Sequence, residues 1–118
     1  MQKKTKMSFI KDDKGKTKLS LIEPAFIVGL GDVLTFGAKK YGVNNWKNAT
    51  KEDVNRYKDA LLRHILAYLD GEKRDKETNL SHLYHATCNL MFLDYLERKG
   101  VKDSSGEQKQ REAAKSFG

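Results

Sequence analysis

The sequence predicts an all-α protein whose three-helix core assembles into an oligomeric helical bundle. Three segments of the 118-residue chain repeat apolar residues at helical spacing, and each is followed by a glycine suited to helix termination: Gly42, Gly71 and Gly100. The length suits one domain with one hydrophobic core. We expect a basic arm or hairpin over 1–18, the helical domain over 19–100 and a polar tail over 101–118.

The lysine-rich segment 1–18 leaves two structures open. Apolar stretches at 7–10 and 19–22 flank the turn-like residues 12–15, so this segment is either a short β-hairpin or a disordered arm. It carries seven Lys and two Asp, whereas 19–100 carry twelve basic and eleven acidic residues. The formal charge of +7 therefore lies mostly in the arm. Because a nucleic-acid binder needs a basic folded surface, we expect no binding to nucleic acid.

The first helix is expected to begin at Glu23-Pro24, because proline suits the first helical turn, and to run towards Lys40. Three glycines interrupt it, and each costs up to about 1 kcal/mol relative to alanine. These glycines, Gly29, Gly31 and Gly37, predict a close approach of the backbone to another helix or to a ligand.

The second helix is expected to open at Thr50, where Asp53 imitates a capping box, and to end at Leu69-Asp70-Gly71. The third helix is expected to start near Asn79 or Ser81 and to reach about Lys99. Its apolar residues lie on two sides, so it should be buried on two sides. Three helices cover such an element poorly, which predicts a homo-oligomer built on the third helix.

Several locations and chemistries are excluded by what the sequence lacks. No apolar run approaches the roughly 20 residues that span a bilayer, and no secretory signal is recognisable. A single cysteine, Cys88, excludes an internal disulfide and a zinc site built from several cysteines. We therefore expect a cytoplasmic protein that makes no contact with a membrane.

The candidate catalytic residues are polar groups at positions where apolar ones are expected. His82, His85 and Asn89 share one stripe of the third helix, and His64 falls on the core stripe of the second. Because burying such groups without partners costs several kcal/mol, they must pair with something. The partners are either each other, in a satisfied polar network, or a ligand or metal ion.

The turn before the third helix is rich in carboxylates. Asp70, Glu72 and Asp75 could hold a hard divalent cation, Mg²⁺ or Mn²⁺, through oxygen ligands and water. The simpler alternative is a charged turn that is only solvated.

The connection between the first two helices combines cations, aromatic rings and amides, which suits a nucleotide. The cations would neutralise phosphates, an aromatic ring could stack on a base, and amides could bind its edge. Alternatively, Tyr41 and Trp46 anchor the loop to the core. The candidate ligand-binding residues are Lys39, Lys40, Tyr41, Asn44, Asn45, Trp46 and, on the second helix, Arg63.

An ordered set of motifs resembles the phage-associated family described as dATP/dGTP diphosphohydrolase, N-terminal domain. The resemblance covers about residues 19–97. Its motifs are Leu19-Ser-Leu-Ile-Glu-Pro, Phe36-Gly-Ala-Lys-Lys-Tyr-Gly, Asn45-Trp-Lys, Arg56-Tyr-x-Asp59-Ala-x-x-Arg63-His64, Asp70-Gly-Glu72 and Leu80-Ser-His82-Leu-x-His85-Ala-x-Cys-Asn89. The resemblance implies a phage or prophage origin. It also implies kinship with small all-α, Mg²⁺-dependent pyrophosphohydrolases of the MazG-like type, although neither of their metal motifs, Glu-x-x-Glu and Glu-x-x-Asp, stands at helical core positions here.

Two functions remain open at the level of sequence. One is metal-dependent hydrolysis of a purine (deoxy)nucleoside triphosphate to the monophosphate and pyrophosphate. The other is a phage protein that binds a cyclic or ADP-ribose-type immune signal without cleaving it, which would require neither a metal ion nor a general base.

Overall fold

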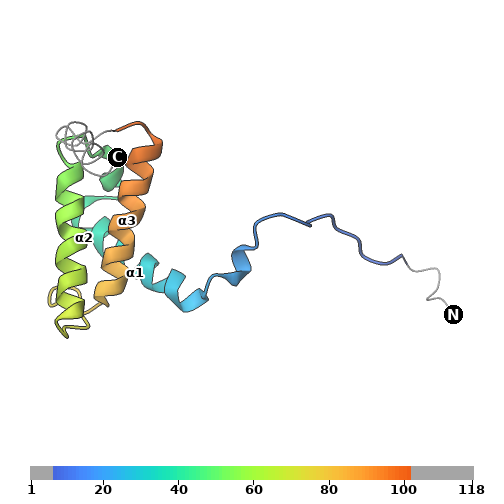
Figure 1. Cartoon of the computed structure of the whole chain (residues 1–118), viewed down its shortest axis with the longest axis horizontal. Helices are drawn as coiled ribbons and strands as arrows, with labels where there is room; N and C mark the ends of the chain where they lie inside the picture. The colour runs from blue at the N-terminus through green and yellow to red at the C-terminus, as the bar shows by residue number, and fades with distance from the viewer. Residues whose placement is uncertain (1–6, 102–118) are drawn as a thin grey trace, which may run out of the picture.

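The computed structural model describes residues 7–101 and contains three α-helices, which confirms the all-α prediction (Figure 1). The helices are α1 (Pro24–Tyr41), α2 (Val54–Leu69) and α3 (His82–Arg98), and the 3₁₀ turns η2 (Leu19–Leu21) and η3 (Asn45–Asn48) precede α1 and α2. Within the described range no strand forms, and residues 7–18 do not pair, so the hairpin alternative is not seen. Residues 1–6 and the predicted tail beyond residue 101 lie outside the described residues.

Helix α3 lies at the centre of the fold, with α2 antiparallel beside it and α1 crossing behind (Figure 1). Within one chain α1 and α2 cover much of α3, but its Leu83 and Leu90 stay 42% and 52% exposed. Among the described residues few side chains are buried: the apolar ones are Val54, Ala86, Cys88 and Leu96, and the polar ones are His82 and Asn89.

Helix ends follow the local sequence signals. The Glu23 carboxylate accepts a hydrogen bond from the Phe26 N–H, and Ser81 accepts one from the Leu83 N–H, so each caps a helix start. Gly42, with φ 100°, takes the backbone conformation that ends α1. None of the helices in the described range is long and apolar enough to cross a membrane.

The start of α2 differs from the prediction. The Asp53 carboxylate does accept hydrogen bonds from the Thr50 N–H and hydroxyl, at 2.9 and 3.1 Å, but the helix begins only at Val54. The Thr50–Asp53 contact closes a separate turn before the helix, because the Asp53 N–H bonds to the Thr50 carbonyl three residues back.

Of the three glycines in α1, one makes the predicted close approach. A Cβ atom at Gly29 would collide with the ring of Tyr84 on α3, whereas nothing lies within 4 Å of the corresponding position at Gly31 or Gly37. The close approach is therefore to a neighbouring helix rather than to a ligand.

Candidate functional site

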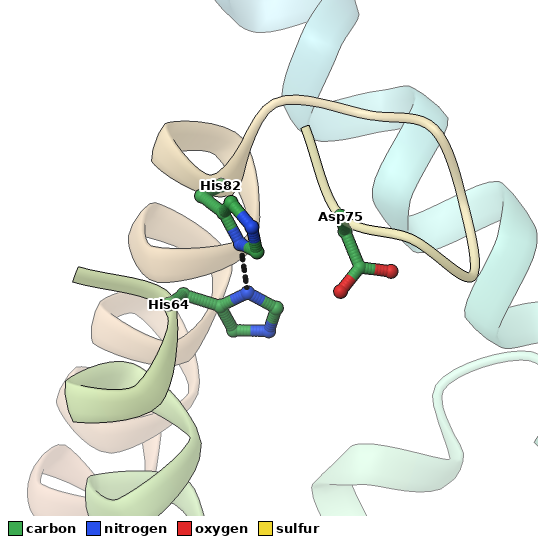
Figure 2. A group of neighbouring side chains, drawn as sticks. All are labelled: His64, Asp75 and His82. Carbon is green, nitrogen blue, oxygen red and sulfur yellow. Dashed lines mark hydrogen bonds between the residues drawn. The ribbon is translucent and has the colours of Figure 1, made fainter. Parts of the chain in front are cut away.

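Three histidines meet between α2 and α3. His64 Nδ1 lies 2.8 Å from His82 Nδ1 (Figure 2). The rings of His64 and His85 stack with centroids 4.5 Å apart and planes 6° from parallel. The antiparallel packing of the two helices brings the last third of α2 against the first turn of α3. His82 is nearly sealed, at 3% exposed, and the other two are partly buried.

The connection between α2 and α3 folds into a fixed loop that delivers carboxylates to these rings. Backbone hydrogen bonds from the Asp75 N–H to the Leu80 carbonyl (2.8 Å) and from the His82 N–H to the Lys73 carbonyl (3.1 Å) close it. Asp75 then accepts hydrogen bonds from the Glu77 and Thr78 N–H groups, each at 3.0 Å. The loop is thus a folded structure rather than a merely solvated turn.

Glu72 fixes the orientation of His82. Its Oε2 lies 2.6 Å from His82 Nε2, and because a carboxylate only accepts, the Nε2–H donates to it. In the neutral imidazole the lone pair then lies on Nδ1, which faces His64. The His64 Nδ1–H therefore donates to His82 Nδ1 in this arrangement.

Burial and neighbouring charge keep the other two imidazoles neutral. Burial lowers the pKa of His64 to about 4, with further lowering from His85 and His82. Burial also lowers the pKa of His85, although the Asp75 carboxylate opposes this. Burial favours the neutral form of Asp75, but hydrogen bonds from the Thr78 backbone and the nearby histidines outweigh it and lower its pKa. At neutral pH His64 and His85 are therefore neutral rings beside an ionised Asp75 carboxylate.

His64, Asp75 and His82 could hold a metal ion, since one ligand atom of each lies within 4.8 Å of the others (Figure 2). Two residues of the predicted carboxylate set take other positions. Asp70 caps the end of α2 and is exposed, and Glu72 lies against the far side of His82. The structure thus places two histidines, rather than two further carboxylates, beside Asp75.

Thr78 is a site residue that the sequence analysis missed. Its Oγ1 lies 2.7 Å from His85 Nε2 and 3.3 Å from Asp75 Oδ2, so one hydroxyl bridges the two groups. The spacing of Asp75 and Thr78 is the signal that could have revealed it, because aspartate commonly binds backbone and hydroxyl groups two or three residues later.

A cleft of about 890 Å³ opens beside the histidines, between the end of α1, the following loop and α2. Six of its lining residues come from the polar cluster and its loop: His64, Asp75, Glu77, Thr78, His85 and Asn89. The predicted ligand-binding residues that line it are Lys40, Tyr41, Asn44, Asn45, Trp46 and Arg63. Lys39 is not among the lining residues, and neither is the nearly sealed His82. Two separately predicted groups, the loop and the histidines, therefore line the same cleft.

Trp46 serves mainly as the anchor that the alternative interpretation of the loop described. Its ring packs against Phe92 (centroids 4.7 Å apart) and Tyr95 (5.0 Å), and its carbonyl accepts a hydrogen bond from the Tyr57 hydroxyl at 3.2 Å. Tyr41, by contrast, is 64% exposed at the cleft and leaves ring surface accessible.

Lys40 and Asn89 have protein partners in this structure. Lys40 Nζ pairs with Glu77 at 2.7 Å, and the hydrogen bond with Glu77 raises the pKa of Lys40. The buried amide of Asn89 donates to the His85 carbonyl one turn earlier at 2.9 Å, so its own helix satisfies that group.

The chain belongs to a family whose description names a nucleotide diphosphohydrolase. Residues 8–105 match the profile of the family described as dATP/dGTP diphosphohydrolase, N-terminal, and the chain is a member of it, as the motifs indicated.

A particular relative is the protein named dATP/dGTP diphosphohydrolase from Salmonella phage PMBT28, which is 41% identical over 90 residues. The match covers 76% of this chain and 30% of the relative, so the chain spans less than a third of that protein. No solved structure matches the chain.

Proposed function

We propose that this domain hydrolyses a purine deoxynucleoside triphosphate, dATP or dGTP, to the monophosphate and pyrophosphate. The family and the name of the phage relative support this reaction. The observation that carries it is the cleft, which is lined both by cationic and amide side chains of the loop and by residues of the histidine cluster. That combination offers partners for phosphate, base and attacking water in one place.

In this reaction water attacks the α-phosphorus, a new P–O bond forms there, and the bond to the bridging oxygen of the β-phosphate breaks. Lys40 and Arg63 line the cleft and would offset the charge of the phosphates. Tyr41 offers an accessible ring for stacking, and Asn44 and Asn45 offer amides for the base edge.

The general base in this proposal is His85. It lines the cleft, and its lowered pKa keeps the ring unprotonated at neutral pH, which is the form that accepts a proton from water. Thr78 and Asp75 hold the ring in place through the hydroxyl bridge. A divalent cation, when bound, would supply charge neutralisation on the phosphates and acidify a bound water.

The test is to incubate the whole chain with each dNTP and Mn²⁺ or Mg²⁺, and to separate the products by ion-exchange chromatography. Deoxynucleoside monophosphate and pyrophosphate in equal amounts, from purine substrates first, are expected. Lys40→Ala should raise KM about tenfold, the value of one charge-assisted contact, whereas Lys39→Ala, outside the cleft, is the matched control. Tight binding with recovery of the intact nucleotide would refute hydrolysis and favour sequestration.

We also propose that the chain forms a homo-oligomer, with a second copy covering an apolar stripe on α2. Leu62, Leu66 and Leu69 lie at helical spacing and are each more than half exposed, while the buried core of the described residues is small. Burying such a stripe against its copy would supply apolar contacts that one chain lacks. Light scattering after size-exclusion chromatography should give a molar mass that is a multiple of 13.5 kDa. The Leu66→Lys variant should have a lower molar mass because the charged side chain disrupts the apolar contact. A clean monomer for the unmodified chain would refute this.

A further inference from the structure

Two imidazoles and one carboxylate converge at the junction of α2 and α3. His64 and His82 approach through their Nδ1 atoms at 2.8 Å, and Asp75 completes a group whose ligand atoms lie within 4.8 Å of one another (Figure 2). The three residues come from three separate elements, namely α2, the loop and the start of α3. Their proximity therefore results from the packing of these elements and not from adjacency in the sequence.

The hydrogen bond between the two rings leaves them able to act as metal ligands through their Nδ1 atoms. One proton lies between two nitrogens, so one of the two carries no hydrogen and aims its lone pair at the other ring. A cation could bind both nitrogens from a position beside the line that joins them if the His64 proton moved to Nε2, because both lone pairs would then be available to the ion. Two nitrogens bound at 2.0–2.1 Å lie about 3 Å apart, close to the spacing already present.

Glu72 prepares His82 for this role. Holding the Nε2–H at 2.6 Å fixes the ring orientation and leaves Nδ1 as the free ligand atom. A carboxylate behind a histidine is the usual outer partner of a metal-binding imidazole, and it raises the basicity of the ligand. His82 is also 3% exposed, so the ring is held rigidly where it lies.

We propose that His64, Asp75 and His82 bind one divalent ion of the first transition series, such as Mn²⁺ or Co²⁺, in preference to Mg²⁺. Affinity for a site with nitrogen ligands rises along this series from Mn²⁺ to Co²⁺, whereas Mg²⁺ prefers carboxylate, phosphate and water oxygens. The ligand set differs from the one expected from sequence, in that Asp70 and Glu72 are replaced by two histidines. The site deepens the proposed function, because the ion would lie beside the cleft that takes the nucleotide.

The experiment is a calorimetric titration of the chelator-treated whole chain with Mn²⁺, Co²⁺ and Mg²⁺, each metal alone. One Mn²⁺ or Co²⁺ per chain is expected, with Mg²⁺ at least tenfold weaker, and bound Co²⁺ should give visible absorption bands. Equal affinity for Mg²⁺, or no binding of Mn²⁺ or Co²⁺, would overturn the proposal.

Matched variants assign the ligands. His64→Gln and Asp75→Asn should weaken Co²⁺ binding by at least tenfold. His85→Phe keeps an aromatic ring beside His64, and Glu77→Gln removes a neighbouring carboxylate that pairs with Lys40, so both should bind Co²⁺ as the unmodified chain does. The matched pairs are His64→Gln with His85→Phe and Asp75→Asn with Glu77→Gln. Circular dichroism should show that all four variants are folded. An equal loss of Co²⁺ affinity in both members of either pair would overturn the ligand assignment.

The titration and the hydrolysis assay separate this inference from the proposed function. Co²⁺ bound by the assigned ligands without hydrolysis of any dNTP supports the metal site and refutes the reaction. Hydrolysis that needs only Mg²⁺ and survives His64→Gln refutes a role of this metal site in the reaction and leaves the reaction standing, whereas loss of Co²⁺ binding by the unmodified chain refutes the site itself.

Discussion

The tight contact between α1 and α3 at Gly29 gives the sharpest stability prediction. A methyl group there would overlap the ring of Tyr84, which also packs edge-on against Phe26 with centroids 5.5 Å apart. Gly31 lies two residues further along the same helix, has nothing within 4 Å of its Cβ position, and is exposed. Comparing Gly29→Ala with Gly31→Ala therefore isolates the packing effect from helix propensity.

Alanine in place of glycine in a helix stabilises by up to about 1 kcal/mol at either position. Overpacking costs about 1–3 kcal/mol, and at Gly29 the Tyr84 ring has to move away to admit the methyl group. The free energy of unfolding should therefore rise by about 0.5–1 kcal/mol in Gly31→Ala. In Gly29→Ala it should fall by up to about 2 kcal/mol.

The assay is equilibrium urea unfolding followed by circular dichroism at neutral pH, with the protein concentration varied to detect association. The quantity to compare is the difference between the two variants, since the unmodified chain is their common reference. If Gly29→Ala proves as stable as Gly31→Ala, the close approach of α1 to Tyr84 is wrong.

Three further predictions concern single side chains. Because the pKa of His64 is lowered to about 4 in the folded chain, the unfolded state binds its proton first as the pH falls below about 6.5. In the presence of a chelator, the free energy of unfolding of the unmodified chain should fall between pH 6.5 and pH 4. The fall should exceed that of the His64→Gln variant by on the order of 2 kcal/mol. Parallel pH profiles of the two proteins would contradict this. Trp46→Ala should lower the free energy of unfolding by about 3 kcal/mol because the ring packs on Phe92, and a urea-melt change below 1 kcal/mol would count against the anchor role. Cys88 is 1% exposed and burial raises its pKa to about 11, so Ellman's reagent should label it only in urea, and rapid labelling of the folded chain would show the thiol to be accessible.

The sequence predicted the helices well because their apolar periodicity and capping residues are local properties. Gly42, Gly71 and Gly100 mark helix ends, and all three have positive φ. The start of α2 was misplaced because the Thr50–Asp53 contact closes an isolated turn as readily as a first helical turn.

The candidate site was predictable in its residue types but not in its partners. The shared stripe of His82, His85 and Asn89 correctly suggested inward-facing polar groups, yet Asn89 bonds within its own helix. Glu72 reaches His82 and Asp75 reaches Thr78 only because of the conformation of an irregular loop. That conformation has no periodic signature, so sequence spacing could not distinguish Asp75 from Asp70.

The residues of the histidine group lie close together in sequence, whereas the opposite wall of the cleft comes from a more distant part of the chain. His64, Glu72, Asp75 and His82 all fall within one helix–loop–helix unit, whereas Lys40 and its neighbours come from the end of α1. Short loops cost less entropy to close, so the helix–loop–helix unit can assemble early in folding, with the α1 wall docking afterwards. Substitutions in that wall can therefore change which ligands the cleft accepts while the contacts among the histidines are kept.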